Sequence, residues 1–204
     1  MNFIFYSIFF FVFLYFMNNS SLQRIINLNN SSYNKLTSYI NSCVHAKIVY
    51  VLSFLFLINV IDVSIWKICL DITRGYCFYD TLMVLFNDPY DYQTLIHHIF
   101  LFIGTYSYYI TLYPHQTAIA LLSEITNQFL YIGWLLIKKD LKDTIYFKIN
   151  GMILLISFFL FRIINFTYLL YFLITYCDIY NSIIFIPITL LNYYWFYLLI
   201  QKIL

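Results

Sequence analysis

Long apolar runs, separated by short polar stretches, follow one another from one end of the chain to the other. A hydrocarbon core about 30 Å thick is crossed by about 20 residues of helix, and the runs lack the alternating pattern of barrel strands. We therefore predict an all-α polytopic membrane protein with about seven transmembrane helices. They cover residues 2–17, 44–61, 73–88, 95–113, 117–137, 149–173 and 183–200.

The N-terminal part of the chain differs from the rest. Residues 1–17 hold the first predicted span and do not begin with basic residues, as a signal peptide would. The sequence that follows them, Asn18-Asn19-Ser20-Ser21, is not a small-residue cleavage site. We therefore favour a retained helix over a cleaved signal peptide. Residues 18–42 are polar and predict a loop or an interfacial segment before the main helical region, 43–204.

Composition supports the membrane prediction. Of the 204 residues, 63% are hydrophobic and 10% are charged, whereas soluble domains carry about 25% charged residues. The net charge of +2 and the absence of a glycine-rich phosphate loop argue against nucleic acid as a partner. The cysteines, Cys43, Cys69, Cys77 and Cys177, lack the spacing of a zinc site. Buried thiols are favoured, and a disulfide between Cys69 and Cys177 stays open.

Basic residues are distributed unevenly over the predicted loops, which sets the expected orientation. Eight lie on the side that holds the first, third and fifth loops and the C-terminus, against two on the other side. The eight are Arg24, Lys35, Lys47, Lys138, Lys139, Lys142, Lys148 and Lys202. This side should be cytosolic and the N-terminus luminal. Sequons at Asn18, Asn19, Asn29 and Asn30 favour a luminal first loop instead; we give the charge bias more weight.

Ionisable residues interrupt four of the apolar runs: the adjacent pair His97 and His98, and the single residues Asp80, Glu124 and Arg162. A charge in hydrocarbon costs about 2.5–3.5 kcal/mol or more unless it is compensated, so such residues indicate a functional site. Their occurrence on four different segments predicts a polar chamber inside the helix bundle.

Counting along the spans at 1.5 Å per residue predicts two polar layers in this chamber. A shallow layer near the cytosol would hold His45 and the histidine pair, and a deeper one Asp80, Glu124 and Arg162. A buried charge is tolerated when it is paired. We therefore expect an ion pair of Arg162 with Glu124 or with Asp80, whose role is either structural or functional.

Five segments in order resemble the TLC-domain family of eukaryotic membrane proteins, which includes the ceramide synthases, and they are most similar to its smaller non-synthase branch. The segments are SCVHAKIVYVLS (42–53), GYCFYDTLMVLF (75–86), LIHHIFLF (95–102), SEITNQFLYIGWLL (123–136) and INGMILLISFFLFRI (149–163). The resemblance implies a TLC-like domain over 43–204, with six helices around a central cavity and one extra N-terminal span. It also implies residence in the endoplasmic reticulum or connected membranes and work on lipids. The recurring family positions fall on His45, Asp80, His97, His98, Glu124, Asn127, Trp134, Asn150 and Arg162.

One departure from the family bears on function. Ceramide synthases carry a further His-Asp element after the histidine pair, whereas residues 118–134 here hold Glu124 as their only acid and no histidine. Ceramide synthesis itself is therefore not expected. The favoured function is non-catalytic: binding of an acyl lipid in the cavity, in membrane lipid homeostasis.

Two alternatives stay open. The chain could be an acyl-CoA-dependent lipid acyltransferase with His97 or His98 as general base, or a factor in lipid or cargo trafficking. In the first case acyl-CoA is a co-substrate, and the basic segment 138–148 would attract its phosphates or lipid headgroups. No metal is expected, because adjacent histidines on a helix point about 100° apart. The partners expected are membrane lipids, and the sequence leaves the oligomeric state open.

Overall fold

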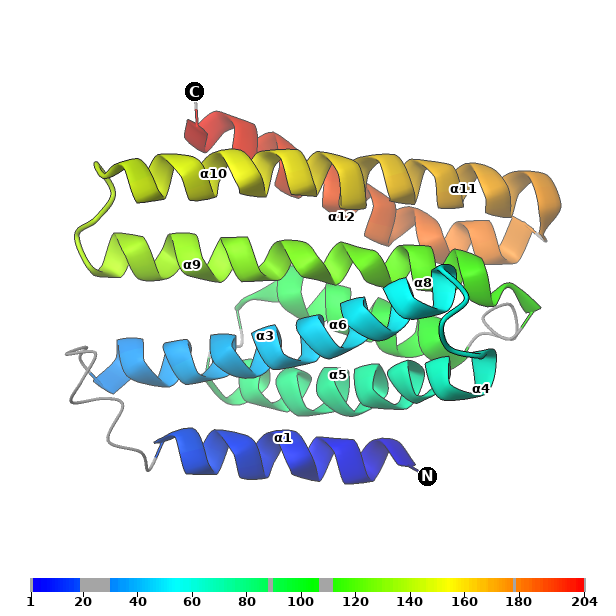
Figure 1. The fold of residues 1–204 in the computed structure, drawn as a ribbon, viewed down its shortest axis with the longest axis horizontal. Coiled ribbons are helices and arrows are strands. Elements are labelled where there is room, and N and C mark those ends of the chain that lie inside the picture. The colour runs from blue at the N-terminus through cyan, green and yellow to red at the C-terminus, as the bar shows by residue number, and fades with distance from the viewer. Residues whose placement is uncertain (1, 19–29, 88–89, 107–111, 178, 204) are drawn as a thin grey trace.

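The computed structural model describes residues 2–18, 30–87, 90–106, 112–177 and 179–203. Within these ranges the chain forms seven long helical rods and no strand, as Figure 1 shows. Four rods are single helices: α1 (Asn2–Asn18), α3 (Asn30–Leu57), α5 (Ile68–Asn87) and α6 (Tyr92–Tyr106). A short helix, α4 (Val63–Trp66), lies between α3 and α5. The others are α8–η1–α9 (Pro114–Leu121, Leu122–Ile125, Thr126–Lys138), α10–η2–α11 (Ile145–Phe158, Phe159–Ile164, Asn165–Tyr176) and α12 (Ile179–Ile203).

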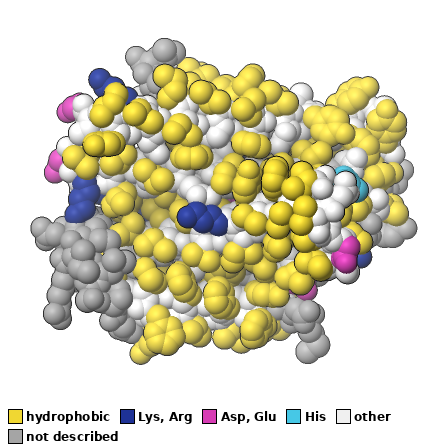
Figure 2. Space-filling view, in the orientation of Figure 1, with side chains coloured by type: hydrophobic (Ala, Val, Ile, Leu, Met, Phe, Trp, Pro, Cys, Tyr) yellow, Lys and Arg dark blue, Asp and Glu magenta, His cyan; other side chains and the backbone are white. Residues whose placement is uncertain are grey.

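The prediction of an all-α membrane protein is confirmed. In the described residues, three stretches are long and apolar enough to cross a membrane, namely Tyr33–Leu57, Pro114–Lys138 and Ile145–Tyr176. A shorter apolar helix covers Phe3–Met17. The space-filling view in Figure 2 shows hydrophobic side chains over most of the visible face, as expected for a surface that contacts lipid.

Consecutive rods run in opposite directions, so their connections alternate between the two ends of the bundle (Figure 1). The start of α3, the α9–α10 connection and the C-terminus lie at one end, and α4 lies at the other (Figure 1). This is the alternation that the sequence predicted. The assignment of the first end to the cytosol remains a prediction.

The prediction of a loop over residues 18–42 is wrong for its second half, because α3 begins at Asn30. Several polar residues of this stretch are buried, whereas Asn34 and Lys35 are exposed. Tyr33 is buried and its hydroxyl donates to the Met17 carbonyl at 2.7 Å, while Asn41 Nδ2 donates to the Phe10 carbonyl at 3.0 Å. Hydropathy therefore failed to predict the first part of α3, because polar side chains there form hydrogen bonds to the neighbouring α1.

Helix α1 packs closely against α5 at Gly75. The Ser7 hydroxyl donates to the Gly75 carbonyl at 2.9 Å, and a Cβ added at Gly75 would lie 2.6 Å from the Tyr6 Cβ. Small residues allow such approach between membrane helices, where dispersion contacts replace the hydrophobic effect. The first helix is thus packed into the bundle, and its retention in the mature chain remains a prediction.

Predictions about the connecting segments have mixed outcomes. Cys69 is a free, buried thiol, and Cys77 is buried as well, so the alternative of a Cys69–Cys177 disulfide is wrong. The sequons at Asn19 and Asn29 lie outside the described residues. Those at Asn18 and Asn30 fall on the last residue of α1 and the first of α3.

Candidate functional site

A cavity of about 830 Å³, which we call the polar chamber, lies between the rods. Every rod contributes to its wall, from Leu14 of α1 to Lys202 of α12. Six of the predicted site residues line it: Asp80, His97, His98, Glu124, Asn127 and Arg162. Lys35 and Lys202 line its wall where α3 begins and α12 ends, at the end of the bundle that carries the C-terminus. His45 and Asn150 are absent from this wall.

The side chains of His98 and Asp80 contact each other between α6 and α5. His98 Nε2 lies 3.5 Å from Asp80 Oδ2, and both residues are buried. Asp80 lies seven residues before the end of α5 and His98 six residues after the start of α6, so both have the same depth below the shared turn. The predicted separation of Asp80 and His98 into two layers is therefore wrong.

His45 lies behind this pair. Its ring stacks on Tyr76 with centroids 4.1 Å apart, and its Nε2 lies 3.4 Å from the Thr73 hydroxyl. The Tyr76 ring in turn meets the His98 ring edge to face at 5.8 Å. His45 thus supports the wall of the chamber from outside it, and the Gly-Tyr-x-x-x-Asp stretch acquires a physical basis: Gly75 admits α1, Tyr76 backs His98, and Asp80 contacts it.

Arg162 is the centre of a second network, and it has no direct ion pair with a carboxylate among the described residues. Its guanidinium donates through Nε to Thr126 Oγ1 at 2.7 Å, through Nη1 to Asn192 Oδ1 at 3.0 Å and through Nη2 to Asn127 Oδ1 at 2.8 Å. The Asn127 amide then donates to Glu124 Oε2 at 2.9 Å. The predicted Arg162–Glu124 and Arg162–Asp80 pairs are wrong, because the Asn127 amide bridges arginine and glutamate.

Both central residues of this network lie on irregular turns. Arg162 is in the π-helical turn η2, and Glu124 is in the 3₁₀ turn η1, and the two turns contact each other. Such turns rotate side chains relative to a regular helix and are frequent at functional sites. They aim the two residues at the bundle centre.

Aromatic side chains enclose the guanidinium. Arg162 Cζ lies 5.2 Å from the Phe158 ring centroid and 5.6 Å from that of Trp195, a cation–π arrangement. Trp195 also contacts the His97 ring at 5.6 Å, and its indole N–H donates to Gln93 Oε1 at 2.7 Å. Trp195 therefore connects the histidine pair to the arginine network.

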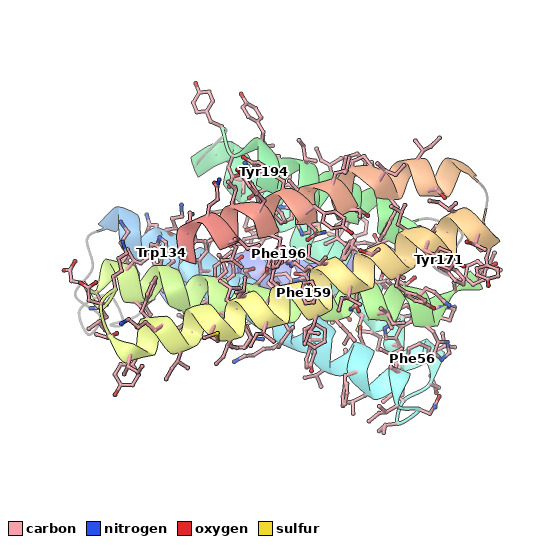
Figure 3. The ribbon with its side chains drawn as sticks, turned by 90° about the horizontal axis from the view of Figure 1, so that it is seen from above. Phe56, Trp134, Phe159, Tyr171, Tyr194 and Phe196 are labelled. Atoms are coloured by element: carbon pink, nitrogen blue, oxygen red, sulfur yellow. The ribbon has the colours of Figure 1, made fainter. Side chains whose placement is uncertain are left out.

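The helices that carry this aromatic enclosure meet in a ring-to-ring contact. Figure 3 shows Phe159 and Phe196 close together where the α10–α11 rod crosses α12, and their ring centroids are 5.8 Å apart. The contact holds α12, and with it Trp195 and Asn192, against the segment that carries Arg162.

Asn150 and Trp134 occupy other positions. Asn150 Nδ2 donates to the Phe129 carbonyl at 2.8 Å, which joins α10 to α9. Trp134 meets Tyr39 edge to face at 5.0 Å and joins α9 to α3. The structure thus places both residues at helix contacts instead of on the chamber wall.

Sequence reasoning did not identify Asn192, Thr126 or Trp195 as parts of the site. Asn192 is the one with a usable signal, because an asparagine within an apolar run must find a partner. Thr126 and Trp195 are common in membrane helices and gave no such signal. Only the packing of α12 and η1 against η2 brings them to Arg162.

A second, smaller cavity of about 400 Å³, the apolar pocket, adjoins the chamber. Its wall comes from α6, α8, η1, α11 and α12 and is mainly apolar, with Phe166, Leu169 and Phe185 among its members. His97, Leu101 and Glu124 line both cavities. A polar space that reaches Lys35 and Lys202 at one end of the bundle therefore meets an apolar space that extends toward the other end.

The site offers hydrogen bonds and charge, and the described residues give no metal centre. In this part of the chain no three His, Cys, Asp or Glu side chains are grouped closely enough to hold an ion. The ring nitrogens Nδ1 of His97 and His98 are buried and have no hydrogen-bond partner. Both histidines nevertheless line the polar chamber.

Comparisons with known proteins agree with this architecture. The family model of the TLC domain matches residues 1–201, and so includes α1 as well as residues 43–201 of the predicted region. TLC domain-containing protein 4 A of Dictyostelium discoideum is 34% identical over 142 residues, which cover 60% of this chain and 52% of that protein. The chain thus spans about half the length of this relative. No solved structure matches the chain. The resemblance predicted from the five segments is confirmed, and the chain belongs to the TLC-domain family.

Proposed function

We propose that this protein binds an acyl lipid inside the membrane and acts in membrane lipid homeostasis. The acyl chain lies in the apolar pocket and the polar end of the lipid lies in the polar chamber. The observation that carries this proposal is the shared wall: His97, Leu101 and Glu124 line both cavities. A molecule with one polar and one apolar part fits this pair of spaces better than a purely polar or a purely apolar ligand.

The polar chamber provides the selectivity in this proposal. An acyl chain that leaves the bilayer for the apolar pocket exchanges one hydrocarbon environment for another, so this transfer contributes little free energy. Hydrogen bonds to the lipid's polar end supply the preference, from polar residues that line the chamber, such as His98, Glu124 and Asn127. The apolar pocket contributes to this selectivity by excluding acyl chains that do not fit between its aromatic side chains.

The test uses two glycines that have the same open surroundings. A Cβ at Gly104 or at Gly151 meets nothing within 4 Å, but Gly104 lines the apolar pocket and Gly151 does not. We expect Gly104→Leu to fill part of the pocket and Gly151→Leu to leave it unchanged. The purified chain in lipid nanodiscs would be photolabelled with a phospholipid that carries a diazirine on its acyl chain. At least fivefold weaker labelling of Gly104→Leu alone supports the proposal; equal labelling of both variants and wild type refutes it.

A second function, acyl transfer from acyl-CoA to a lipid amine or hydroxyl, is favoured by the His98–Asp80 contact. Asp80 would orient the His98 ring, and His98 would remove the proton of the attacking group as that group bonds to the thioester carbon. The carbon–sulfur bond breaks, and His98 returns the proton to the CoA thiolate. In this mechanism Asp80 has the role of the acidic residue that follows the histidine pair in ceramide synthases and that this sequence lacks.

Lipid analysis separates the two functions. Cells that express wild type, His98→Ala or Asp80→Asn at equal abundance would be extracted and compared by mass spectrometry. If wild type raises one acyl-lipid class and both variants fail to do so, the acyltransferase is supported. If all three shift lipids alike, catalysis by His98 is excluded and lipid binding remains.

We also propose that the chamber faces the cytosol in membranes of the endoplasmic reticulum. The basic residues predicted at the cytosolic side include Lys35 and Lys202, which line the chamber wall. A cytosolic opening would admit an acyl-CoA as well as a lipid headgroup. Protease removal of a C-terminal epitope in sealed microsomes tests this orientation; a protected epitope would reverse it.

A further inference from the structure

Lys47 lies near mid-depth of the bundle and faces outward. It is fourteen residues from one end of the apolar stretch Tyr33–Leu57 and ten from the other, which corresponds to about 21 and 15 Å of helix. The neighbouring Tyr50 ring lies 6.4 Å from that of Phe161, beside Arg162 at the bundle centre. The sequence analysis assigned Lys47 to the cytosolic side. That assignment is wrong, because α3 begins at Asn30 and carries Lys47 into the membrane.

No carboxylate of the described residues pairs with the charge of Lys47. It is exposed, and it forms neither an ion pair nor a hydrogen bond there. A lysine near a helix end reaches water by extending its side chain along the helix. The four-carbon stem of lysine spans roughly 6 Å, which is shorter than either path from Lys47 to the ends of its span.

The surface around Lys47 is apolar. Val51 and Phe54 follow it on the same face of α3, and their side chains are 48% and 45% exposed. Figure 2 shows a Lys or Arg side chain isolated among hydrophobic ones on the face that α3 crosses. Apolar side chains alone need only lipid as their neighbour, but a cation at this depth costs about 2.5–3.5 kcal/mol or more without an anion.

We propose that this face of α3 binds a transmembrane helix of another protein that carries an Asp or Glu near mid-membrane. Pairing the two charges removes the cost that each helix bears alone in lipid. A lipid phosphate is not the occupant, because it lies at the membrane surface, beyond the reach of the Lys47 side chain. The proposed surface consists of Lys47, Val51 and Phe54 and is independent of the lipid site.

The described residues of a second copy of this chain do not supply the anion. Of its described carboxylates, Asp80 and Glu124 are at mid-depth but buried inside the bundle. The others are near helix ends: Asp62, Asp71, Asp91, Asp140 and Asp143. The partner is therefore a different protein.

The test measures association with a synthetic transmembrane helix. The full chain, labelled with a fluorescent donor, is reconstituted in phosphatidylcholine vesicles with acceptor-labelled Leu/Ala helices. One helix carries Asp at its midpoint, a second carries Leu there, and a third carries Asp one turn from its end. We expect roughly three- to tenfold stronger association with the mid-membrane Asp helix than with the other two, in the range measured for polar contacts between membrane helices.

Variants assign the effect to Lys47. Lys47→Leu should reduce association with the mid-membrane Asp helix to the level of the Leu helix, and Lys47→Arg should retain it. Lys148→Leu, which removes an exposed charge near the start of α10, is the matched control and should have no effect. Lys47→Asp should bind instead a helix with Lys at its midpoint.

Three outcomes would overturn the proposal. These are equal association of the Asp and Leu helices with wild type, an unchanged preference in Lys47→Leu, and an equal loss in Lys148→Leu. Energy transfer between donor- and acceptor-labelled copies of the chain that disappears in Lys47→Leu would assign this face to self-association and likewise exclude a different protein as the partner.

Discussion

Replacement of Arg162 by leucine tests the central network most directly. Folding moves this side chain from lipid into a site where it donates three hydrogen bonds, to Thr126, Asn127 and Asn192. An arginine left in lipid costs about 2.5–3.5 kcal/mol, and folding relieves that cost in wild type but not in the leucine variant. Arg162→Leu also leaves the side-chain oxygens of Asn127 and Asn192 without their donor.

We therefore expect Arg162→Leu to lower the free energy of unfolding by about 3 kcal/mol, which is more than a hundredfold in the folding equilibrium. The assay is unfolding of the purified chain in mixed micelles with increasing SDS, followed by circular dichroism and tryptophan fluorescence. Leu160→Ala is the matched control: it lies in the same π-helical turn but is 45% exposed, so we expect a change within about 0.5 kcal/mol.

An unfolding free energy of Arg162→Leu within 0.5 kcal/mol of wild type would refute this account of the network. It would mean that Thr126, Asn127 and Asn192 find other partners, and that Arg162 serves ligand binding alone. A loss shared equally by Leu160→Ala would mean that the π-helical turn itself is fragile and that the hydrogen bonds are not the cause.

Three further predictions concern other parts of the chain. Gly75→Ala should destabilise the protein by about 1–3 kcal/mol in SDS unfolding, because its Cβ would overlap α1, whereas Gly151→Ala should not destabilise it. Asp80→Asn should leave abundance unchanged but alter the NMR shifts of the His98 ring, which loses its carboxylate contact; an unchanged His98 spectrum would contradict the contact. Hydrogen bonds from the Ser64 side chain and the backbone of Ile65 and Ser64 lower the pKa of Asp62. The cap on α4 should therefore be fully present above the ordinary carboxyl pKa and be lost as pH falls through the lowered value, seen as faster exchange of the Ile65 amide; equally slow exchange at low pH would contradict this.

The sequence by itself determined the class of protein and most of the site's membership. Apolar run length gave the helical rods, because a bilayer requires about 20 residues of helix per crossing. The cost of a charge in lipid identified Asp80, His97, His98, Glu124 and Arg162 as interior groups. All five line the polar chamber.

Only the tertiary structure decided which of these groups meet. Asp80 contacts His98 because α5 and α6 share a turn, and Arg162 reaches Glu124 only through Asn127. The depth of a residue along its own span does not predict such partners, because contacts also depend on helix rotation and on irregular turns such as η1 and η2. Hydropathy also could not predict where α3 begins, because polar residues in its first part form hydrogen bonds to α1 inside the bundle. That early start decides the position of Lys47, whose depth depends on where its helix begins.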